Sequence, residues 1–221
     1  MHIRIITPPT RRCLLAAVIA QAALLAAAHA SLISPVSATT NMGSGFSTSL
    51  TNTINGVGLS SLSLTAEHTE TLDENSWVSQ AGILTGKITF DLGALVLIDG
   101  FSFWNQNNGG PGALGSTGIK GVQIGYSTNN ITFNPLLGAP TVFAQATGNT
   151  SFAQQFTFPP VIAEFVQFTV LSDYGDVNYT GFAEIQFSRV PEPGTVLTGV
   201  LGAGVCFIGL LSRSRRSAAR Q

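Results

Sequence analysis

The amino-acid sequence predicts an all-β sandwich or jelly roll for the body of the chain, residues 31–190. No stretch of this body keeps apolar residues at the 3.6-residue period of a helix. Short segments instead alternate apolar and polar residues, as half-buried strands do. Gly, Asn, Ser, Thr and Pro separate these segments, and many apolar positions are phenylalanine, which the chain contains 14 times. Short strands divided by turn-rich loops favour a sandwich.

The first 30 residues have the three parts of a secretory signal. A basic start, an apolar stretch and a small-residue cleavage site follow one another: Arg4, Arg11 and Arg12; Leu14 to Ala28; and Ala28-His29-Ala30. We therefore expect export, with cleavage after Ala30. The two adjacent arginines also loosely match a twin-arginine signal, and the sequence does not separate this route from the general secretory one.

Five segments of the body carry the alternation that predicts strands. Their apolar positions, in chain order, are Ile88, Phe90 and Leu92; Phe101 and Phe103; Val122, Ile124 and Tyr126; Val166, Phe168 and Val170; and Ala183, Ile185 and Phe187. Ser127 to Asn130 form a predicted turn after the third segment. Glu184 and Gln186 lie between the apolar residues of the last segment, so the alternation assigns them to its opposite face.

The charge and cysteine content of the body exclude several classes of partner and of chemistry. It carries three basic residues against ten acidic ones, a net charge of −7, between basic ends. An acidic surface disfavours nucleic acid as a partner and suits cations or neutral glycans. The two cysteines, Cys13 and Cys206, fall in the terminal apolar stretches. The body therefore has no disulfide, thiol nucleophile or thiolate metal ligand.

The last segment of the chain predicts a membrane anchor. Thr195 to Leu211 contains 17 residues without a charge, which as a helix would cover roughly 26 Å, slightly less than a bilayer core. The tail 212–221 carries four arginines, which mark the cytoplasmic side. Together with the export signal, this pattern places the body outside the inner membrane.

The segment 190–221, "VPEPGTVLTGVLGAGVCFIGLLSRSRRSAARQ", closely resembles the PEP-CTERM sorting signal of Gram-negative bacteria. The motif Pro191-Glu192-Pro193, a short Gly/Leu-rich membrane helix at about 195–211 and the basic tail occur in the family's order. The resemblance implies an exosortase-type membrane protease as a partner, a transient inner-membrane anchor, and final placement at the cell surface or in an extracellular polysaccharide matrix. The two prolines independently predict an extended, accessible stalk.

Residues 31–189 resemble a discoidin-type (coagulation-factor C-domain, galactose-binding-like) sandwich. Four pieces occur in the family's order: "ITFDLGALVLIDGFSFWN", "GIKGVQIGYSTNNITFNPL", "FPPVIAEFVQFTVLSDYG" and "YTGFAEIQF". The hairpin carries "STNN" where a glycine is usual, and Asn55 to Ser79 is longer and richer in Ser and Thr than the family's loop.

The discoidin resemblance implies a structural Ca²⁺, with Glu184, Asn55 and Asp73 at the matching positions. Carbonyls and one or two carboxylates can supply the six to eight oxygens that Ca²⁺ takes. The alternative is that Glu184 faces solvent on its strand and that residues 67–75 form a solvated acidic loop. The sequence leaves both open. His68 is the only histidine of the body, which disfavours zinc.

Two polar-aromatic loops are candidates for carbohydrate binding, because sugars stack on aromatic faces and hydrogen-bond to amides and carboxylates. The residues of the two loops are Trp104, Asn105, Gln106, Asn107 and Asn108; and Tyr174, Asp176 and Asn178. If both loops lie at one end of the sandwich, they form a shallow patch. The alternative is that Trp104 belongs to the core and the amides stabilise turns.

Motifs for nucleophile elbows, HExxH zinc sites and phosphate-binding loops do not occur in the sequence. We therefore expect an exported, non-catalytic protein of the cell envelope or exopolysaccharide matrix that binds carbohydrate or matrix weakly. The alternatives are a purely structural surface protein without a defined ligand and, less favoured, a polysaccharide-modifying enzyme.

Overall fold

The computed structural model describes residues 31–107 and 115–190. The expected signal peptide, Asn108, and the segment with the Pro-Glu-Pro motif, membrane helix and basic tail lie outside the described residues. Within them, no helix is long and apolar enough to cross a membrane.

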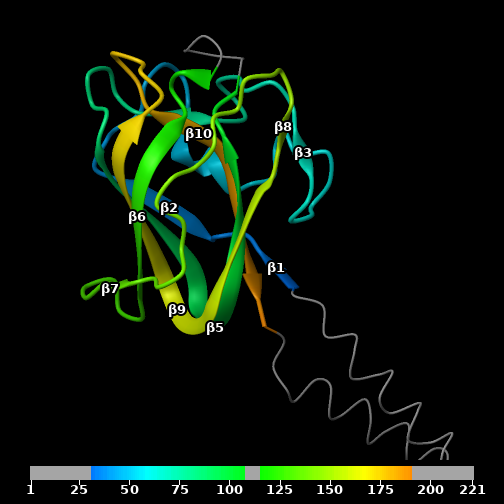
Figure 1. Ribbon diagram of the computed structural model, residues 1–221, viewed down its shortest axis with the longest axis vertical. Helices are drawn as coiled ribbons and strands as arrows, with labels where there is room; N and C mark the ends of the chain where they lie inside the picture. The colour runs from blue at the N-terminus through cyan, green and yellow to red at the C-terminus, as the bar shows by residue number, and fades with distance from the viewer. Residues whose placement is uncertain (1–30, 108–114, 191–221) are drawn as a thin grey trace, which may run out of the picture. The chain divides into compact units, whose positions relative to one another are not determined.

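The described chain is built from strands and a single short 3₁₀ helix, which confirms the all-β prediction (Figure 1). The elements in order are β1 (Ser31–Ile33), β2 (Ser37–Thr40), η1 (Leu50–Thr53), β3 (Glu67–His68), β4 (Trp77–Val78), β5 (Gly86–Asn105), β6 (Ile119–Ser127), β7 (Asn134–Pro135), β8 (Ser151–Phe152), β9 (Gln154–Asp173) and β10 (Gly181–Arg189).

Two long strands, β5 and β9, connect the two layers of the sandwich. The first part of β5 pairs with β2 and with the last part of β9, which also pairs with β6. The second part of β5 pairs with β10 and with the first part of β9. Both strands bend at one end of the molecule, where the register between them breaks after Asp91 (Figure 1). Gly93 lies at this bend with φ of 81°, a conformation that side chains disfavour.

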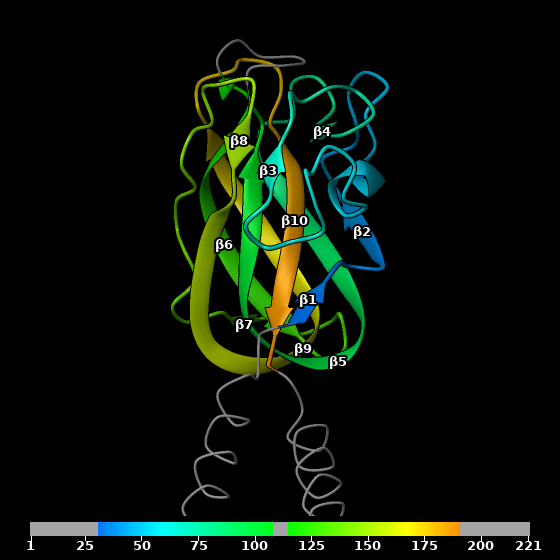
Figure 2. The ribbon, with the colours of Figure 1, turned by 90° about the vertical axis from the view of Figure 1, so that its right-hand side faces the viewer.

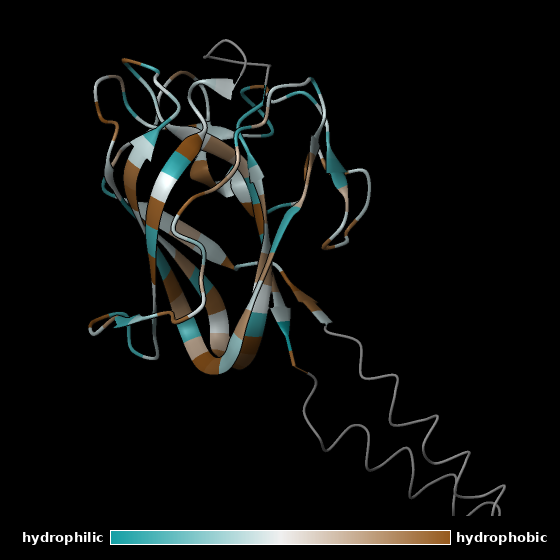
Figure 3. Ribbon diagram, viewed as in Figure 1, coloured by the Kyte–Doolittle hydropathy of each residue, from teal (hydrophilic) through white to brown (hydrophobic). Residues whose placement is uncertain are grey.

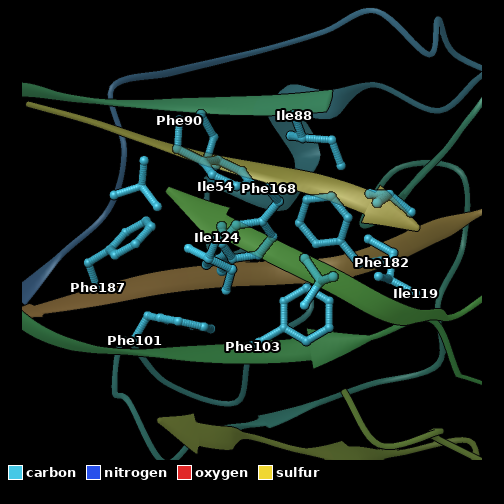
Figure 4. Close-up of a cluster of buried hydrophobic side chains, with 14 of the residues drawn as sticks. Ile54, Ile88, Phe90, Phe101, Phe103, Ile119, Ile124, Phe168, Phe182 and Phe187 are labelled. Atoms are coloured by element: carbon cyan, nitrogen blue, oxygen red, sulfur yellow. The ribbon is translucent and has the colours of Figure 1, made fainter. Parts of the chain in front are cut away.

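The space between the layers is filled by phenylalanine and branched aliphatic side chains (Figure 4). Phe101 lies at the centre, with its ring centroid 5.1–6.3 Å from those of other phenylalanines. These are Phe143, Phe156, Phe158, Phe168 and Phe187. Most of the rings meet tilted or edge to face, as aromatic quadrupoles prefer. Figure 3 shows the apolar and polar residues alternating along the strands that form this core.

The predicted turn at Ser127 to Asn130 is present. Two of its residues show how it forms without a glycine. Asn130 adopts φ of 57°, the left-handed conformation that asparagine tolerates better than most residues. The hydroxyl of Ser127 accepts hydrogen bonds from the backbone N–H groups of Asn129 and Asn130, at 3.2 and 3.1 Å. The side chains of the turn therefore stabilise it directly.

The prediction for β10 needs one correction. The alternation placed Ala183 with Ile185 and Phe187, but the buried residue that joins those two in the core is Phe182. A shift in register against β5 between Phe182 and Glu184 causes this change. Ala183 instead packs in a small second cluster with Trp104 and Ala66, on the outer side of the strand.

The loops that carry the candidate residues gather at one end of the sandwich, here called the loop end (Figures 1 and 2). Backbone hydrogen bonds join them: Gly45 N–H to Val78 O at 2.9 Å, Gly82 N–H to Asn178 O at 2.7 Å, and Tyr174 N–H to Ser116 O at 3.1 Å. The opposite end contains the β5–β9 bend. There Ser31 pairs with Arg189, and the N–H of Val190 donates to Leu97 O.

Candidate functional site

Trp104 is fully buried, which corrects the predicted sugar-binding patch. Its side chain is 0 % exposed, and its indole Nε1–H donates to the carbonyl of Ala66 at 2.8 Å. A sugar can stack only on an exposed ring face. The faces of Trp104 are covered in this structure, as the core alternative held, so the ring has no surface to offer.

The amides that follow Trp104 are buried as well. Asn105 donates to the carbonyls of Ile119 and Ala144, at 2.8 and 2.9 Å, and thereby joins β5 to two neighbouring segments. The carbonyl of the Asn107 side chain accepts from Thr71, while its N–H group donates to Thr69 O at 2.8 Å. Gln106 is 0 % exposed, and its amide has no hydrogen-bond partner in the described structure. Asn105 and Asn107 therefore hold loops together.

The second predicted loop lies beside the first, because Phe182 pairs with Asn105 and Tyr174 is bonded to the segment before β6. Tyr174 is half-buried, its hydroxyl donates to Phe143 O at 2.6 Å, and the ammonium of Lys120 lies 5.5 Å from its ring centroid. Asp176 accepts hydrogen bonds from the N–H groups of Asn178 and Tyr179. Of the three residues predicted here, Asn178 alone is exposed; the other two shape the loop.

An aromatic pair that the sequence did not indicate lies at the loop end, with Phe46 exposed and Tyr179 half-buried. The rings of Phe46 and Tyr179 stack at a tilt of 45°, with centroids 4.9 Å apart. Phe46 is 61 % exposed and has φ of 51°, the left-handed region that a residue with a bulky side chain rarely adopts. Such a conformation persists only where its surroundings enforce it, and it is frequent in binding sites.

Hydrogen bonds from a buried tryptophan fix the loop that carries Phe46. The buried indole of Trp77 donates from Nε1 to Gly43 O and Ser44 Oγ, both at 3.0 Å. A Cβ at Gly45 would lie 3.1 Å from the Tyr179 ring, so the glycine allows the ring to pack against the backbone. The sequence signal for this feature was a phenylalanine directly after two closely spaced glycines and outside any alternating segment, "GSGFS".

Two exposed amides flank the aromatic pair. Asn178 directly precedes Tyr179, and Gln80 lies against Gly43, with its N–H bonded to Met42 O at 2.9 Å. We call Phe46, Gln80, Asn178 and Tyr179 the loop-end patch. Its rings, carbonyls and N–H groups can bind a ligand that has both C–H faces and hydroxyl groups.

The three predicted calcium ligands are not brought together by any contact between their side chains. Glu184 is fully buried, so the solvent-facing alternative for it is wrong. Its Oε2 accepts from the N–H of Gly56 at 3.1 Å, next to Asn55, whose own side chain is exposed and accepts from Val57 N–H. The carbonyl of Asp73 accepts from Asn52.

The surroundings of Glu184 do not fit a calcium shell as they stand. Its carboxyl oxygens face N–H donors, from Gly56 and, at 3.4 Å, from Gln186. Among the described residues, no three or more Asp, Glu, His or Cys side chains group around a possible metal position. The side-chain carbonyl of Gln186, two residues along the strand, is buried and has no hydrogen-bond partner in the described structure. Calcium stays a prediction from the family resemblance.

Burial changes the titration of two groups in this region. Desolvation raises the pKa of Glu184 to about 8, against smaller opposing effects of the hydrogen bonds from Gly56 and Gln186. Desolvation likewise lowers the pKa of His68, although hydrogen bonds to the backbone, the largest of them to Thr69 O, oppose the change. Both groups are therefore favoured in their neutral forms when the protein is folded.

A model described as the F5/8 type C domain matches residues 51–185, more than half of the chain. The chain therefore belongs to the F5/8 type C domain family, which confirms the discoidin-like sandwich. A search of the curated proteins found no match.

Several solved structures with low sequence identity are similar to this chain. The lectin domain of lectinolysin, solved with Lewis b antigen, is 12 % identical, with a TM-score of 0.50 over 70 % of this chain and 93 % of that one. The family 32 carbohydrate-binding module of Clostridium perfringens NanJ, solved with galactose, is 15 % identical, with a TM-score of 0.49 over 72 % and 100 %. A module from the same organism, CpGH89CBM32-5 with GalNAc-β-1,3-galactose, is 15 % identical, with a TM-score of 0.45 over 68 % and 93 %.

Proposed function

We propose that this chain is an exported, non-catalytic carbohydrate-binding protein that holds its ligand on the loop-end patch. The observation that carries the proposal is the exposed Phe46 ring paired with the half-buried Tyr179, on a loop that the Trp77 indole fixes by hydrogen bonds. An exposed phenylalanine in the left-handed conformation costs about 1–3 kcal/mol. A role in binding accounts for its presence there.

The chemistry of the patch suits a neutral sugar. The Phe46 ring can stack on the C–H face of a pyranose, while Asn178 and Gln80 can donate to and accept from its hydroxyls. None of the four patch residues is charged. The nearest acidic side chain in sequence, Asp176, has one oxygen committed to two backbone N–H groups. One exposed ring and two amides imply weak affinity.

Family membership and fold support the same proposal. The lectinolysin domain, which has this fold, was solved with a sugar antigen. For location, the support is the sequence alone: the export signal, the Pro-Glu-Pro motif and the apolar run with its basic tail. They favour processing by an exosortase-type protease after transient anchoring in the inner membrane, and a place at the surface or in the polysaccharide matrix of a Gram-negative bacterium.

Replacing Phe46 with glycine tests the proposal without unfolding the loop. Glycine accepts φ of 51° without strain, a gain that offsets the loss of about 0.5–1.5 kcal/mol from the ring pair. We expect Phe46→Gly to keep the Tm of the unchanged protein within about 2 °C and to weaken retention on its best glycan at least fivefold. A glycan array of neutral and acidic sugars, followed by titration calorimetry, measures this.

Phe152→Ala is the matched control, because Phe152 is also an exposed phenylalanine, 69 % accessible, but lies on β8. It should leave glycan retention unchanged. An array on which the unchanged protein binds nothing, or equal binding by Phe46→Gly, contradicts the proposal and favours a structural protein without a defined ligand.

A further inference from the structure

A hollow lies on the outer face of the sheet, at β6, β7 and β9. It encloses about 440 Å³, in the range of pockets that hold small ligands. Its floor is β6 at Gln123 and Gly125, and one side is β9 at Gln167 and Thr169. The segment 133–141, which contains β7, forms the other side. Figure 1 shows β7 well away from the loop end.

The backbone forms this groove without any ligand. The segment 133–141 is bonded to β6 at two points, through Leu136 N–H to Ile124 O at 2.9 Å and Val122 N–H to Thr141 O at 3.0 Å. Gly125 leaves space in the floor: a Cβ there would approach Asn134 O to 3.2 Å. A ligand therefore meets a preformed site and little ordering cost opposes its binding.

The lining of the groove combines apolar surface with polar, uncharged side chains and contains no charged residue, although the body has a net charge of −7. Gln123 and Thr169 lie opposite each other in register across β6 and β9. The amide of Gln167 donates to Thr89 Oγ1 at 3.0 Å, which orients its carbonyl. Phe133 and Pro140 add apolar surface. Groups that both donate and accept, beside apolar faces, match a chain of sugar hydroxyls and C–H groups.

We infer that this groove is a second binding site, which takes an uncharged, extended segment of polysaccharide. A peptide is a poorer match, because peptides that add to a sheet need a free strand edge, and β6 already pairs with β9 on one side and β7 on the other. An anionic polysaccharide would find no cation among the lining residues. The inference is independent of the loop-end patch and gives the domain two places to bind one polymer.

The test uses the double variant Gln123→Ala/Gln167→Ala of the full-length chain, kept in a detergent without sugar groups. Native gels containing dextran, laminarin or cellulose oligomers measure retardation of the protein by neutral glucans. We expect retardation of the unchanged protein by at least one glucan and about a tenfold weaker effect for the double variant, as the loss of two hydrogen-bonding side chains predicts. Thr157→Ala, an exposed position on β9 outside the groove, is the control and should behave as the unchanged protein.

Phe46→Gly separates this inference from the proposed function, because it removes the loop-end ring and leaves the groove intact. Retardation that survives Phe46→Gly but is lost in the double variant supports the groove. Protection of Phe133 from hydroxyl-radical labelling by cellohexaose would support it independently. Failure of every neutral glucan to retard the protein, or equal retardation of the double variant, overturns the inference.

Discussion

The two faces of β10 are equally buried but are held in different ways. Its inner face places Phe182, Ile185 and Phe187 in the phenylalanine core. Its outer face carries Glu184 and Gln186, which are also 0 % exposed. The outer face is covered by residues 55–69, here called the cover segment, which follows η1 and includes β3.

Hydrogen bonds, more than apolar contacts, hold the cover segment in place. Ser102 donates to Leu64 O at 2.6 Å, the Trp104 indole donates to Ala66 O, and Gly56 N–H donates to Glu184. The apolar cluster beneath is small, and the described structure gives no partner to His68 Nε2. Burial of a polar face thus depends on its polar groups each finding a hydrogen-bond partner. The stability of the core depends instead on the apolar area it buries and on how closely its side chains pack.

The largest effect is expected on the inner face. Phe101→Ala removes the ring around which the other phenylalanines pack and leaves a cavity. We expect it to lower the free energy of unfolding by about 3–5 kcal/mol, measured by urea denaturation. A loss below about 1 kcal/mol would show that the core does not depend on close packing.

On the outer face, Glu184 makes stability depend on pH. An acid whose pKa is higher in the folded protein than in the unfolded chain favours folding at low pH. The stability it contributes is complete below the ordinary value of 4.5 and is lost as pH rises through about 8. We expect Glu184→Gln, which keeps the shape and removes the titration, to be more stable than the unchanged protein by roughly 2–4 kcal/mol at pH 9 and similar to it at pH 4. Urea denaturation at both pH values measures this.

The same variant tests the predicted calcium site. If Glu184 binds Ca²⁺, millimolar Ca²⁺ raises the Tm of the unchanged protein, EDTA reverses the rise, and Glu184→Gln loses the response. A Tm that does not respond to Ca²⁺, together with a stabilised variant at pH 9, indicates that the carboxyl is buried in its protonated form. His68 has the opposite effect on the pH dependence of stability. Because its pKa is lower in the folded protein than in the unfolded chain, the protein loses stability as the pH falls below 6.5.

The smallest effect is expected from Trp104→Phe, which removes the hydrogen bond to the cover segment and leaves the buried carbonyl of Ala66 without that donor. We expect a loss of about 1–3 kcal/mol and faster hydrogen exchange in residues 55–69. Trp77→Phe is the matched variant, because its indole bonds hold the Phe46 loop. It should weaken glycan binding and leave exchange in the cover segment unchanged.

The difference between the inner and outer faces of β10 also explains which features the sequence could predict. Alternation identifies a strand that has one buried face, so Ile88, Phe90, Val166 and Phe168 were placed correctly. It cannot identify a polar face that a distant loop covers, and therefore it could not show that Glu184 is buried. The cover segment itself has no period, because its contacts run through backbone carbonyls such as those of Leu64 and Ala66.

For the candidate site, the two loops that the sequence singled out both lie at the loop end, but of the predicted binding residues that the structure describes only Asn178 is exposed. Asparagine and glutamine after a strand look the same in sequence whether they bind a ligand or join loops, and Asn105 and Asn107 join loops. The sequence did not predict Phe46 as a site residue, because its exposure results from a backbone conformation and from hydrogen bonds by Trp77, which is 31 residues away. Neither is visible in a local pattern.

The pairing of Ser31 with Arg189 has a consequence for how the domain meets its surroundings. The strands where it starts and finishes run side by side at the pole opposite the Phe46–Tyr179 pair, so a tether joined at either strand pulls on the same pole. A force applied there acts on the short strand β1 and on the last residues of β10, and not directly on the loops at the loop end. If the chain is anchored at this pole as proposed, a ligand on the loop-end patch would lie at the pole away from the anchor.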